Sequence, residues 1–515
     1  MRILGISGMF HDASATMIDN GNIVFAGHAE RYSREKNDPY INKQLMKEAC
    51  AGGLPDVIVL HESSKLKKQR RIQQLSWSSI KSAFTEPTME DWLSKFYPQF
   101  KGIPVTNCLH HQSHAAAGML TVPHKDWKDA AIVTIDAIGE KQTATISTWE
   151  DGKRILLRHE VNFPNSLGLF YSAVTSAVGL KPMEDEYILM GMAAYGEPKY
   201  KIKMETHLFD TPAEDRHKCL HTIDMSKGLP SSFLNDIDVE DEQTQFDLAA
   251  SAQAVVEERI ISYCRLAFAY SGGSRNLVYM GGVALNCVAN SLIYEKDVFK
   301  NIWIMPNPGD AGSSLGAAAL YYFESTGEFV NWQGPYLGTN IEGKWPTNKF
   351  LESLRKGQIF GVANGRAEFG PRALGNRSLF ADARGTEVKD KVNAIKRRQE
   401  FRPFAPIVLE EHANDWFEMP AGKSNSPYMS FVAKCKKPDV VPAICHADGT
   451  SRVQTVNRVQ HPDLYHAMRQ WYAESGCPIV LNTSLNIKGQ PIVNTEAEAE
   501  EFAKHYKVKV HCRDD

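Results

Sequence analysis

The sequence is poor in cysteine, and its cysteines form no recognisable pair. Nine cysteines are spread over 515 residues, and no Cys-x-x-Cys motif occurs. This usage suits a reducing cytosol and argues against a disulfide framework or a zinc ribbon. We therefore expect a cytoplasmic protein.

Long apolar runs and a strong net charge are also missing. No stretch of 18 or more apolar residues occurs, and the chain opens directly into a strand-like segment, residues 2–6, rather than a basic and then apolar leader. We expect no spanning helix, no cleaved leader and no membrane partner. A net charge of −3 gives no support for a protein coated in nucleic acid. Walker motifs and Gly-x-Ser-x-Gly elbows are absent as well.

Locally, the charge is less even. The segment from Lys65 to Lys81 carries six basic residues and no acidic one, and it includes Trp77. It is either a solvated helix face or a place of contact with an anionic polymer.

A weak internal repeat indicates how the chain is organised. Residues 3–7 are followed by a hairpin over residues 15–26, and residues 131–136 are followed by a hairpin over residues 143–157. The two hairpin turns carry Asn-Gly and Asp-Gly dipeptides, which are strong hairpin signals. This is the plan of the actin, sugar-kinase and Hsp70-like (ribonuclease-H-like) fold. We therefore expect duplicated α/β lobes with a nucleotide's phosphates held between their turns.

Two histidines and two aspartates form a candidate metal site. His110 and His114 lie one helical turn apart, so both imidazoles project from one side of a helix. Asp136 ends a strand shortly downstream, and Asp310 lies in a Gly-Asp-Ala-Gly turn. Two nitrogens and two carboxylate oxygens suit a divalent ion with positions open to substrate; Fe(II) is our first choice, and zinc and manganese are also compatible. Asp310 could otherwise serve only as a helix cap.

A glycine-rich turn is a candidate nucleotide-binding element. Residues 277–280 predict a strand that runs into Gly281 and Gly282, and Asn286 follows. Glycines let a ligand approach the backbone, and the asparagine could bond a ribose or base. A glycine pair needed only for packing would leave almost the same pattern.

Arginines are concentrated in residues 364–378, which hold three arginines and three glycines after an apolar run that predicts a buried strand. The guanidinium fork matches phosphate and carboxylate oxygens, so we expect a site for a small, multiply charged anion rather than a solvated loop. The candidate ligands for this anion are Arg372, Lys396, Arg402, Arg452, Asn482 and Ser484.

The chain resembles the O-carbamoyltransferases of the family that includes the nodulation-factor, cephamycin and tobramycin enzymes. The similarity lies in ordered blocks along nearly the whole chain: residues 11–15, 30–36, 110–114, 135–136, 139–140, 190–196, 281–290, 309–312, 368–378, 401–406, 446–455 and 481–486. It implies duplicated actin-like lobes with a metal site, over residues 1–335, followed by an α+β YrdC-like domain, over residues 350–515.

The resemblance also implies a two-step reaction. The YrdC-like domain would make carbamoyl adenylate from carbamoyl phosphate and ATP, with Mg²⁺ accompanying the ATP. The metal-bearing domain would then pass the carbamoyl group to an acceptor hydroxyl. His11 or Asp12 would take the hydroxyl proton, although Asp12 could instead cap a turn.

The acceptor and two other functions stay open at this point. The acceptor could be a free small molecule or sugar, or a 5-hydroxymethyl pyrimidine in DNA. The alternatives are a tRNA threonylcarbamoylation-type enzyme, which would use threonine and bicarbonate, and a non-enzymatic actin-like nucleotide-binding scaffold. A scaffold has no need of a metal with open positions, so the His and Asp set argues against it. A homodimer is compatible with all of these.

Overall fold

The structure, a computed structural model, describes residues 1–73, 81–82, 85–123, 125–209, 225–399, 404–420 and 423–514. Trp77 and Arg402 lie outside these residues. The chain forms two compact units. Unit 1 contains Met1–Ala29, Asn37–Leu285 and Lys296–Trp332, and unit 2 contains Glu30–Lys36, Asn286–Glu295 and Gln333–Asp515.

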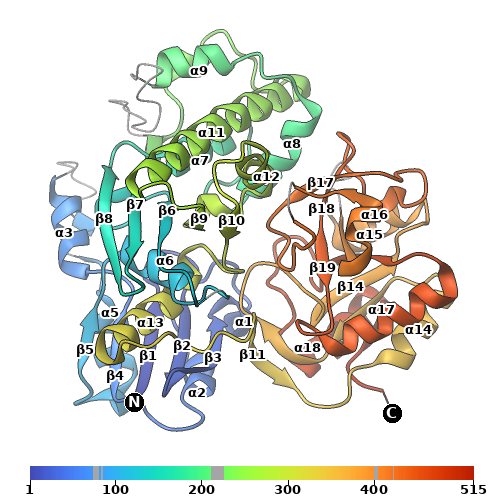
Figure 1. The fold of residues 1–515 in the computed structure, drawn as a ribbon, viewed down its shortest axis with the longest axis horizontal. Coiled ribbons are helices and arrows are strands. Elements are labelled where there is room, and N and C mark those ends of the chain that lie inside the picture. The colour runs from blue at the N-terminus through green and yellow to red at the C-terminus, as the bar shows by residue number, and fades with distance from the viewer. Residues whose placement is uncertain are drawn as a thin grey trace. The chain divides into compact units, whose positions relative to one another are not determined.

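Unit 1 is built on two five-stranded sheets, and the first has the strand order β3-β2-β1-β4-β5 (Figure 1). Strands β1, β2 and β3 form an antiparallel meander. Strand β4 then pairs with β1 in parallel, and β5 pairs with β4 in parallel. The strands are β1 (Arg2–Ser7), β2 (Ser14–Asp19), β3 (Asn22–His28), β4 (Val57–Leu60) and β5 (Val105–Asn107).

The second sheet repeats this arrangement with the order β8-β7-β6-β9-β10. Strands β6, β7 and β8 are antiparallel, and β9 and β10 are added in parallel next to β6. The strands are β6 (Ala130–Ile135), β7 (Gln142–Glu150), β8 (Arg154–Asn162), β9 (Asn276–Met280) and β10 (Asn301–Trp303). Gly21 and Gly152 adopt φ of +80° and +67° in the two hairpin turns. The predicted duplication is confirmed.

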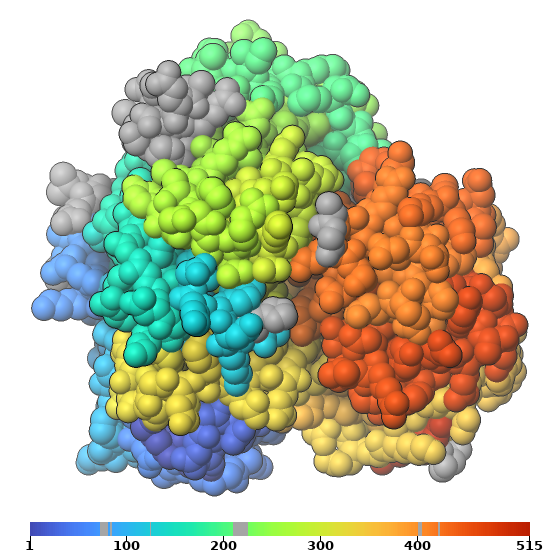
Figure 2. Space-filling model, in the orientation of Figure 1, coloured from blue at the N-terminus to red at the C-terminus, as the bar shows by residue number. Residues whose placement is uncertain are grey.

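Two helices of small residues join the lobes of unit 1. Helix α6 (His110–Met119) packs on the second sheet and α13 (Ser313–Thr326) packs on the first, and the two helices contact each other. Their backbones approach closely: a Cβ on Gly316 would lie 1.8 Å from the Ser113 carbonyl oxygen, and one on Gly5 would lie 1.9 Å from that of Ser314. In the space-filling view the yellow segment around α13 lies against the blue amino-terminal segment (Figure 2). This contact fixes the start of α13 beside α6.

Helix α11 (Glu242–Tyr270) is the longest in unit 1 and covers the second lobe. Asp241 caps this helix by accepting a hydrogen bond from the backbone N–H of Thr244 (2.8 Å). At the other end, Gly272 follows the helix with φ of +65°. No helix in the described part of the chain has the length and apolar character needed to cross a membrane.

The remaining helices of unit 1 are short. They are α2 (Lys43–Ala49), α3 (Ser64–Gln73), α5 (Met89–Phe96), α7 (Leu167–Ala177), α8 (Glu186–Met192), α9 (Lys201–Leu208) and α10 (Ser231–Leu234), with 3-10 turns that include η5 (Gly282–Leu285) and η6 (Asp310–Gly312).

Unit 2 contains a six-stranded mixed sheet of order β19-β15-β20-β14-β12-β21. Its strands are β12 (Phe360–Ala363), β14 (Arg377–Asp382), β15 (Ala405–Leu409), β19 (Gln454–Val456), β20 (Ile479–Ser484) and β21 (Lys509–His511). A smaller sheet holds β16 (Phe417–Glu418), β17 (Val432–Cys435) and β18 (Thr450–Arg452), and a pair joins β11 (Tyr336–Ile341) to β13 (Gly365–Glu368).

Helices flank this sheet and complete an α+β unit whose described residues form four apolar clusters. They are α14 (Thr347–Arg355), α15 (Val388–Lys396), α16 (Ala413–Trp416), α17 (Pro462–Ser475) and α18 (Glu496–Tyr506). The predicted fold class, duplicated α/β lobes followed by an α+β domain, is confirmed.

Two short segments from the amino-terminal part of the sequence belong to unit 2. In the segment with α1 (Glu30–Ser33), Arg31 is buried and donates to the Gly370 carbonyl (3.2 Å), and Arg34 pairs with Glu498 (3.0 Å). In α12 (Cys287–Glu295), Asn290 donates to the Ser430 carbonyl (3.1 Å).

Candidate active site

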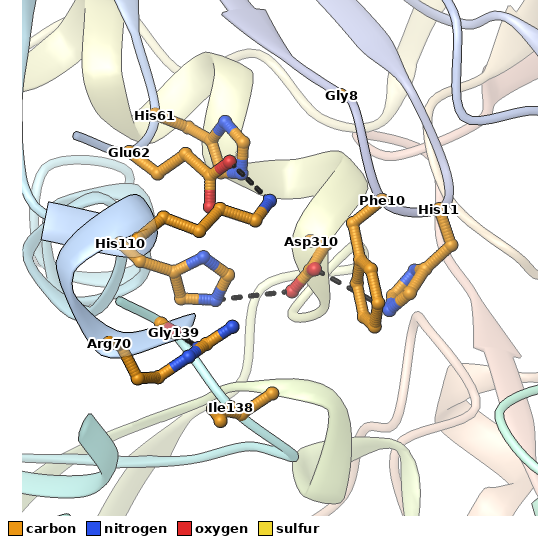
Figure 3. A pocket seen from close by; sticks show the side chains of 11 residues that line it. Gly8, Phe10, His11, His61, Glu62, Arg70, His110, Ile138, Gly139 and Asp310 are labelled. Atoms are coloured by element: carbon orange, nitrogen blue, oxygen red, sulfur yellow. Dashed lines mark hydrogen bonds and ion pairs between the residues drawn. The ribbon is translucent and has the colours of Figure 1, made fainter. Parts of the chain in front are cut away.

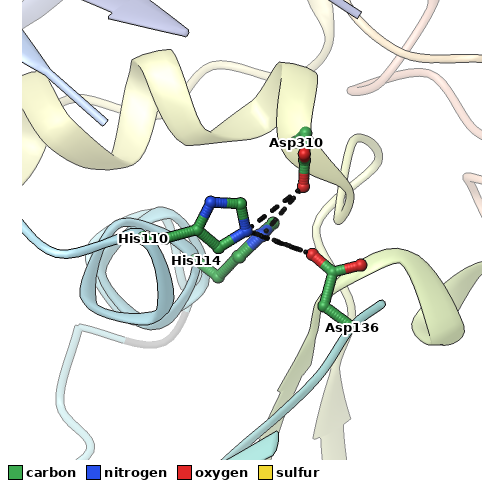
Figure 4. A group of neighbouring side chains, drawn as sticks. All are labelled: His110, His114, Asp136 and Asp310. Atoms are coloured by element: carbon green, nitrogen blue, oxygen red, sulfur yellow. Dashed lines mark hydrogen bonds and ion pairs between the residues drawn. The ribbon is translucent and has the colours of Figure 1, made fainter. Parts of the chain in front are cut away.

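Four side chains of unit 1 converge on one point (Figure 4). His110 and His114 project from the first turns of α6. Asp136 directly follows the buried strand β6, and Asp310 begins the turn η6 that leads into α13. Each residue therefore lies at a strand end or a helix start, where the backbone is fixed by the sheet behind it.

The distances within this His/Asp cluster are short. Nε2 of His114 lies 3.0 Å from Oδ2 of Asp136 and 3.3 Å from Oδ1 of Asp310. Nε2 of His110 lies 3.3 and 3.4 Å from the same two oxygens. The two imidazole nitrogens are 3.1 Å apart.

The cluster is buried, and its groups shift one another's pKa values. Burial lowers the pKa of His110, but the Asp310 and Asp136 carboxylates outweigh this and raise it well above its usual range. Burial raises the pKa of Asp310, but His110 and His11 outweigh this and lower it well below its usual range. The carboxylates thus remain charged and attract a cation.

The donor set fits a divalent metal ion. Donors bound about 2.1 Å from one ion lie roughly 3 to 3.5 Å apart, which matches the separations found here. Two imidazole nitrogens and two carboxylate oxygens leave positions for substrate on an ion such as Fe(II), Mn²⁺ or Zn²⁺. The metal itself stays a prediction.

Surrounding groups hold the ligands in place. The Glu140 carboxylate accepts the backbone N–H of His110 at 3.1 Å, and Ser313 Oγ lies 3.4 Å from Nδ1 of His114. Such outer contacts orient metal ligands. His111, on the other side of α6, does not join the cluster: its Nδ1 contacts Thr145, and burial lowers its pKa to about 3.

The glycine turn predicted to bind a nucleotide lies beside Asp136. The N–H of Gly282 donates to Asp136 Oδ1 (3.3 Å), and a Cβ on Gly282 would lie 2.9 Å from that oxygen. Gly281 adopts φ of +92°, and its Cβ would lie 2.2 Å from the Ile135 carbonyl oxygen. Packing alone thus requires both glycines. Asn286 accepts the N–H of Ala289 at the start of α12 (3.1 Å), and nucleotide binding by these residues stays a prediction.

The predicted general base lies next to the cluster. Nε2 of His11 is 3.6 Å from Asp310 Oδ2, and its Nδ1 is 3.1 Å from Asp12 Oδ2. Burial lowers the pKa of His11, but Asp310 and Asp12 raise it to about 9. Asp12 therefore contributes to the raised pKa of His11. Its own backbone has φ of +51°.

A pocket opens beside His110 and Asp310, and sequence reasoning missed most of its charged lining (Figure 3). His61, Glu62, Lys67 and Arg70 line it with Phe10, His11, Ile138 and Gly139. Burial lowers the pKa of His61 to about 4, so this imidazole is neutral. The sequence held one signal for His61 and Glu62. Both directly follow strand β4, and the other site residues also lie at strand ends or helix starts.

The basic segment that begins at Lys65 is only partly free for an external anion. Lys67 pairs with Glu62 (2.6 Å), and Arg71 pairs with Glu86. Lys67 and Arg70 also face the pocket just described rather than a polymer-sized surface. The proposed stacking residue, Trp77, lies outside the described residues.

In unit 2 the structure brings several of the predicted anion ligands near one another. Lys396 is buried, and its Nζ donates to the Ser484 carbonyl oxygen and side chain and to the Asn486 carbonyl and Oδ1. Asn482 donates to the Ala373 carbonyl (2.9 Å) and to Gln454 Oε1 (2.8 Å). Arg372 directly precedes Ala373 in the chain, Arg452 lies two residues before Gln454, and both arginines are half-buried. Arg402 lies outside the described residues.

Two of the three arginines in the segment 364–378 bind the protein's own backbone. Arg377 is fully buried and donates to the carbonyls of Asn494, Asn364, Gly365, Asn376 and Thr339. Arg366 donates to the carbonyls of Leu337 and Gly338. Glu368 accepts the N–H of Leu374 (2.7 Å) and so holds the turn. These two arginines shape the loop, and binding of an anion by Arg372 stays a prediction.

The fold and the cluster together define an α/β protein of duplicated lobes with a convergent His/Asp site and a second, α+β unit. The sequence matches the family description "Carbamoyltransferase N-terminus" over residues 89–319 and "Carbamoyltransferase C-terminus" over residues 351–514. It is 33% identical to an uncharacterized protein of Synechocystis sp., over 96% of this chain and 93% of that protein. The chain therefore belongs to the carbamoyltransferase family and is an enzyme of that class.

Two further relatives carry functional names. The nodulation protein NolNO of Sinorhizobium fredii is 30% identical over 95% of this chain and 76% of its own length. The 3'-hydroxymethylcephem-O-carbamoyltransferase of Amycolatopsis lactamdurans is 26% identical over 94% of this chain and 93% of its own length. Because the chain belongs to this family, the protein is an enzyme and not the non-enzymatic scaffold.

Proposed function

We propose that the protein is an ATP-dependent O-carbamoyltransferase that takes the carbamoyl group of carbamoyl phosphate and transfers it, through carbamoyl adenylate, to an acceptor hydroxyl. The observation that carries the proposal is the convergence of His110, His114, Asp136 and Asp310, with ligand atoms within 4.8 Å of one another, in a carbamoyltransferase chain. Relatives named for O-carbamoyl transfer support the hydroxyl acceptor.

Unit 2 would form the adenylate. Carbamoyl phosphate, ATP and water would give carbamoyl adenylate, inorganic phosphate and pyrophosphate. Arg372 and Arg452 would neutralise phosphate oxygens with their guanidinium forks. Asn482 Oδ1 is a buried acceptor without a hydrogen-bond partner among the described residues, and it suits the carbamoyl NH₂ group as a donor. Lys396 and Ser484 would hold the loop around the anion through their mutual hydrogen bonds.

Unit 1 would carry out the transfer. The acceptor oxygen would bond to the carbamoyl carbon while the bond from that carbon to the AMP oxygen breaks, and AMP would leave. His11 would accept the hydroxyl proton on Nε2, and Asp12 would orient the ring through Nδ1. A divalent cation on the four ligands would polarise the carbamoyl carbonyl and offset the carboxylate charge that now raises the pKa of His11.

The test is a labelled transfer assay. The metal-loaded protein is incubated with carbon-labelled carbamoyl phosphate, ATP and a panel of sugars, nucleosides and polyols. We expect pyrophosphate exchange that depends on carbamoyl phosphate, and label in an acid-stable ester of one acceptor. A protein that exchanges no pyrophosphate under any of these conditions would contradict the two-step function.

A second candidate acceptor is a 5-hydroxymethyl pyrimidine in DNA. It is supported by exposed Lys65 and the neighbouring Lys68 on α3, which are not among the residues that line the pocket. Because such chemistry usually needs a base outside the stack, single strands should react at least as well as duplex. Binding to DNA that does not weaken with added salt would argue against this acceptor.

A further inference from the structure

The pocket beside the predicted metal site contains the guanidinium of Arg70, which forms no direct ion pair with a carboxylate among the described residues. We propose that this pocket binds the acceptor, and that Arg70 and Lys67 select an acceptor with a carboxylate or phosphate near its reactive hydroxyl. The proposal rests on the proposed function, because it names the acceptor class for the same site.

Arg70 carries the argument. Its guanidinium is half-buried and points into the pocket beside His110 and Ile138 (Figure 3). One nitrogen, Nη1, donates to the Gly139 carbonyl, while the buried Nε has no hydrogen-bond partner. Among the described residues no carboxylate lies within ion-pair distance of this guanidinium. A partly buried charge without a counter-ion is costly, and an anionic ligand would relieve that cost.

Lys67 adds a second positive group on the same face of α3, one turn before Arg70. Its side chain is 12% exposed, and its Nζ bonds Oε1 of Glu62 at 2.6 Å. That contact uses one of the three ammonium donors, and Nζ also lies 5.6 Å from the centre of the Phe10 ring. The remaining donors are available to a ligand oxygen in the pocket.

The charges around the pocket favour a singly or doubly negative ligand. Apart from His110 and Asp310 of the predicted metal site and the neighbouring His11, the charged lining residues are Lys67, Arg70 and Glu62. Two cations face one carboxylate. A guanidinium presents parallel donors that match the two oxygens of a carboxylate or phosphate, whereas a neutral hydroxyl can use only one of them. The pocket also contains His110 and lies next to His11, so a hydroxyl beside the anionic group would reach the transfer site.

The experiment compares three small acceptors: glycerol, glycerol 3-phosphate and glycerate. They share adjacent hydroxyls and differ in the anionic group, so the phosphate and carboxylate arms are separated. Carbamoyl transfer is measured for the wild type, Arg70→Met, Lys67→Met and the control Lys65→Met, which changes an exposed cation of the same helix. Pyrophosphate exchange is measured in parallel.

We expect the wild type to carbamoylate at least one anionic acceptor about tenfold faster than glycerol, the loss expected when one charge-assisted pair is missing. Arg70→Met should slow transfer to the anionic acceptor much more than transfer to glycerol and so remove this preference, while pyrophosphate exchange measures adenylate formation separately. Lys67→Met should weaken the preference, and Lys65→Met should not change it.

Three results would overturn the inference. The first is wild-type transfer to glycerol as fast as to both anions. The second is an equal loss for all three acceptors in Arg70→Met, which would assign Arg70 to the carbamoyl donor. The third applies if no acceptor reacts and binding is measured by calorimetry instead. The inference is then overturned if glycerol 3-phosphate and glycerate bind no more tightly than glycerol, or if their tighter binding persists in Arg70→Met. Absence of pyrophosphate exchange in the wild type would contradict the proposed function instead, and the binding comparison would still decide the acceptor class.

Discussion

Nε2 of His11 lies 3.6 Å from Oδ2 of Asp310, which brings the turn after the first strand against the turn that begins α13. Ser14 fixes this contact: its hydroxyl donates to the Ala311 carbonyl (2.6 Å) and bonds the Ser314 hydroxyl (2.8 Å). The predicted proton acceptor and a predicted metal ligand are thus held together by the packing of the first sheet on α13. The predictions below test this site and the second unit.

The metal site should fail when one ligand is removed. We expect His114→Ala to lose bound divalent metal and carbamoyl transfer, because a site with three ligands binds more weakly. Pyrophosphate exchange should be unchanged, since we propose that unit 2 makes the adenylate. Elemental analysis of the purified variants measures the metal. A metal-free wild type that is fully active in chelator would contradict the assignment.

The close approach of Gly282 to Asp136 should also matter for metal binding. A methyl group there would lie 2.9 Å from Asp136 Oδ1, so Gly282→Ala should displace this ligand. We expect metal affinity to fall roughly 10- to 100-fold, the range for altered outer contacts. Gly309→Ala is the control, because its methyl group would meet no atom closer than 3.9 Å. Equal affinities in a competition titration would show that Asp136 is not a ligand.

Adenylate formation should depend on Arg372. Arg372→Ala removes a fork of donors from the proposed anion site and should reduce carbamoyl-phosphate-dependent pyrophosphate exchange by at least tenfold. Metal content should stay at the wild-type level. Arg355→Ala, which changes an exposed pair with Glu474, serves as control. Normal exchange in Arg372→Ala would remove this residue from the site.

The buried Arg377 should be needed for the stability of unit 2. Arg377→Met leaves five backbone carbonyls without their donor, and we expect the free energy of unfolding to fall by roughly 3–5 kcal/mol. The free energy of unfolding of Arg377→Lys should lie between those of wild type and Arg377→Met, because an ammonium has fewer donors than a guanidinium. Urea unfolding followed by fluorescence gives the change. A midpoint equal to that of wild type in Arg377→Met would contradict the structural role.

His461 should make stability depend on pH. Its Nε2 lies 2.8 Å from Asn376 Oδ1, its Nδ1 accepts the Leu464 N–H, and burial lowers its pKa to about 4. In the unfolded chain the His461 imidazole binds a proton near pH 6.5. Its contribution to the free energy of unfolding is therefore complete above that pH and is lost as the pH falls toward 4. The loss between pH 7 and pH 5 should be on the order of 2 kcal/mol.

The measurement compares urea midpoints of wild type and His461→Asn from pH 7.5 to 4.5. The difference between the two proteins should stay constant at the upper end and shrink below about pH 6.5. A difference that is flat over the whole range would show that His461 titrates normally in the folded protein.

Much of the site could be read from local sequence patterns. The hairpin turns, the strand before Asp136 and the helical spacing of His110 and His114 are local features, and backbone periodicity fixes them. Their repetition predicted the duplicated lobes, and the ends of paired strands in such lobes lie together. The four cluster residues could therefore be named without a structure.

What only the tertiary structure decided is which charged side chains face one another. Arg377 and Arg372 come from the same arginine-rich turn, yet one binds backbone carbonyls in the core and the other stays half-buried. Lys67 and Arg70 belong to a basic run that resembled a solvated surface, yet both line the pocket beside His110. The spacing of residues along the chain does not predict such contacts, because they depend on how helices pack onto distant strands. The sequence determined the fold and the His/Asp cluster, whereas packing decided the charges that would select a substrate.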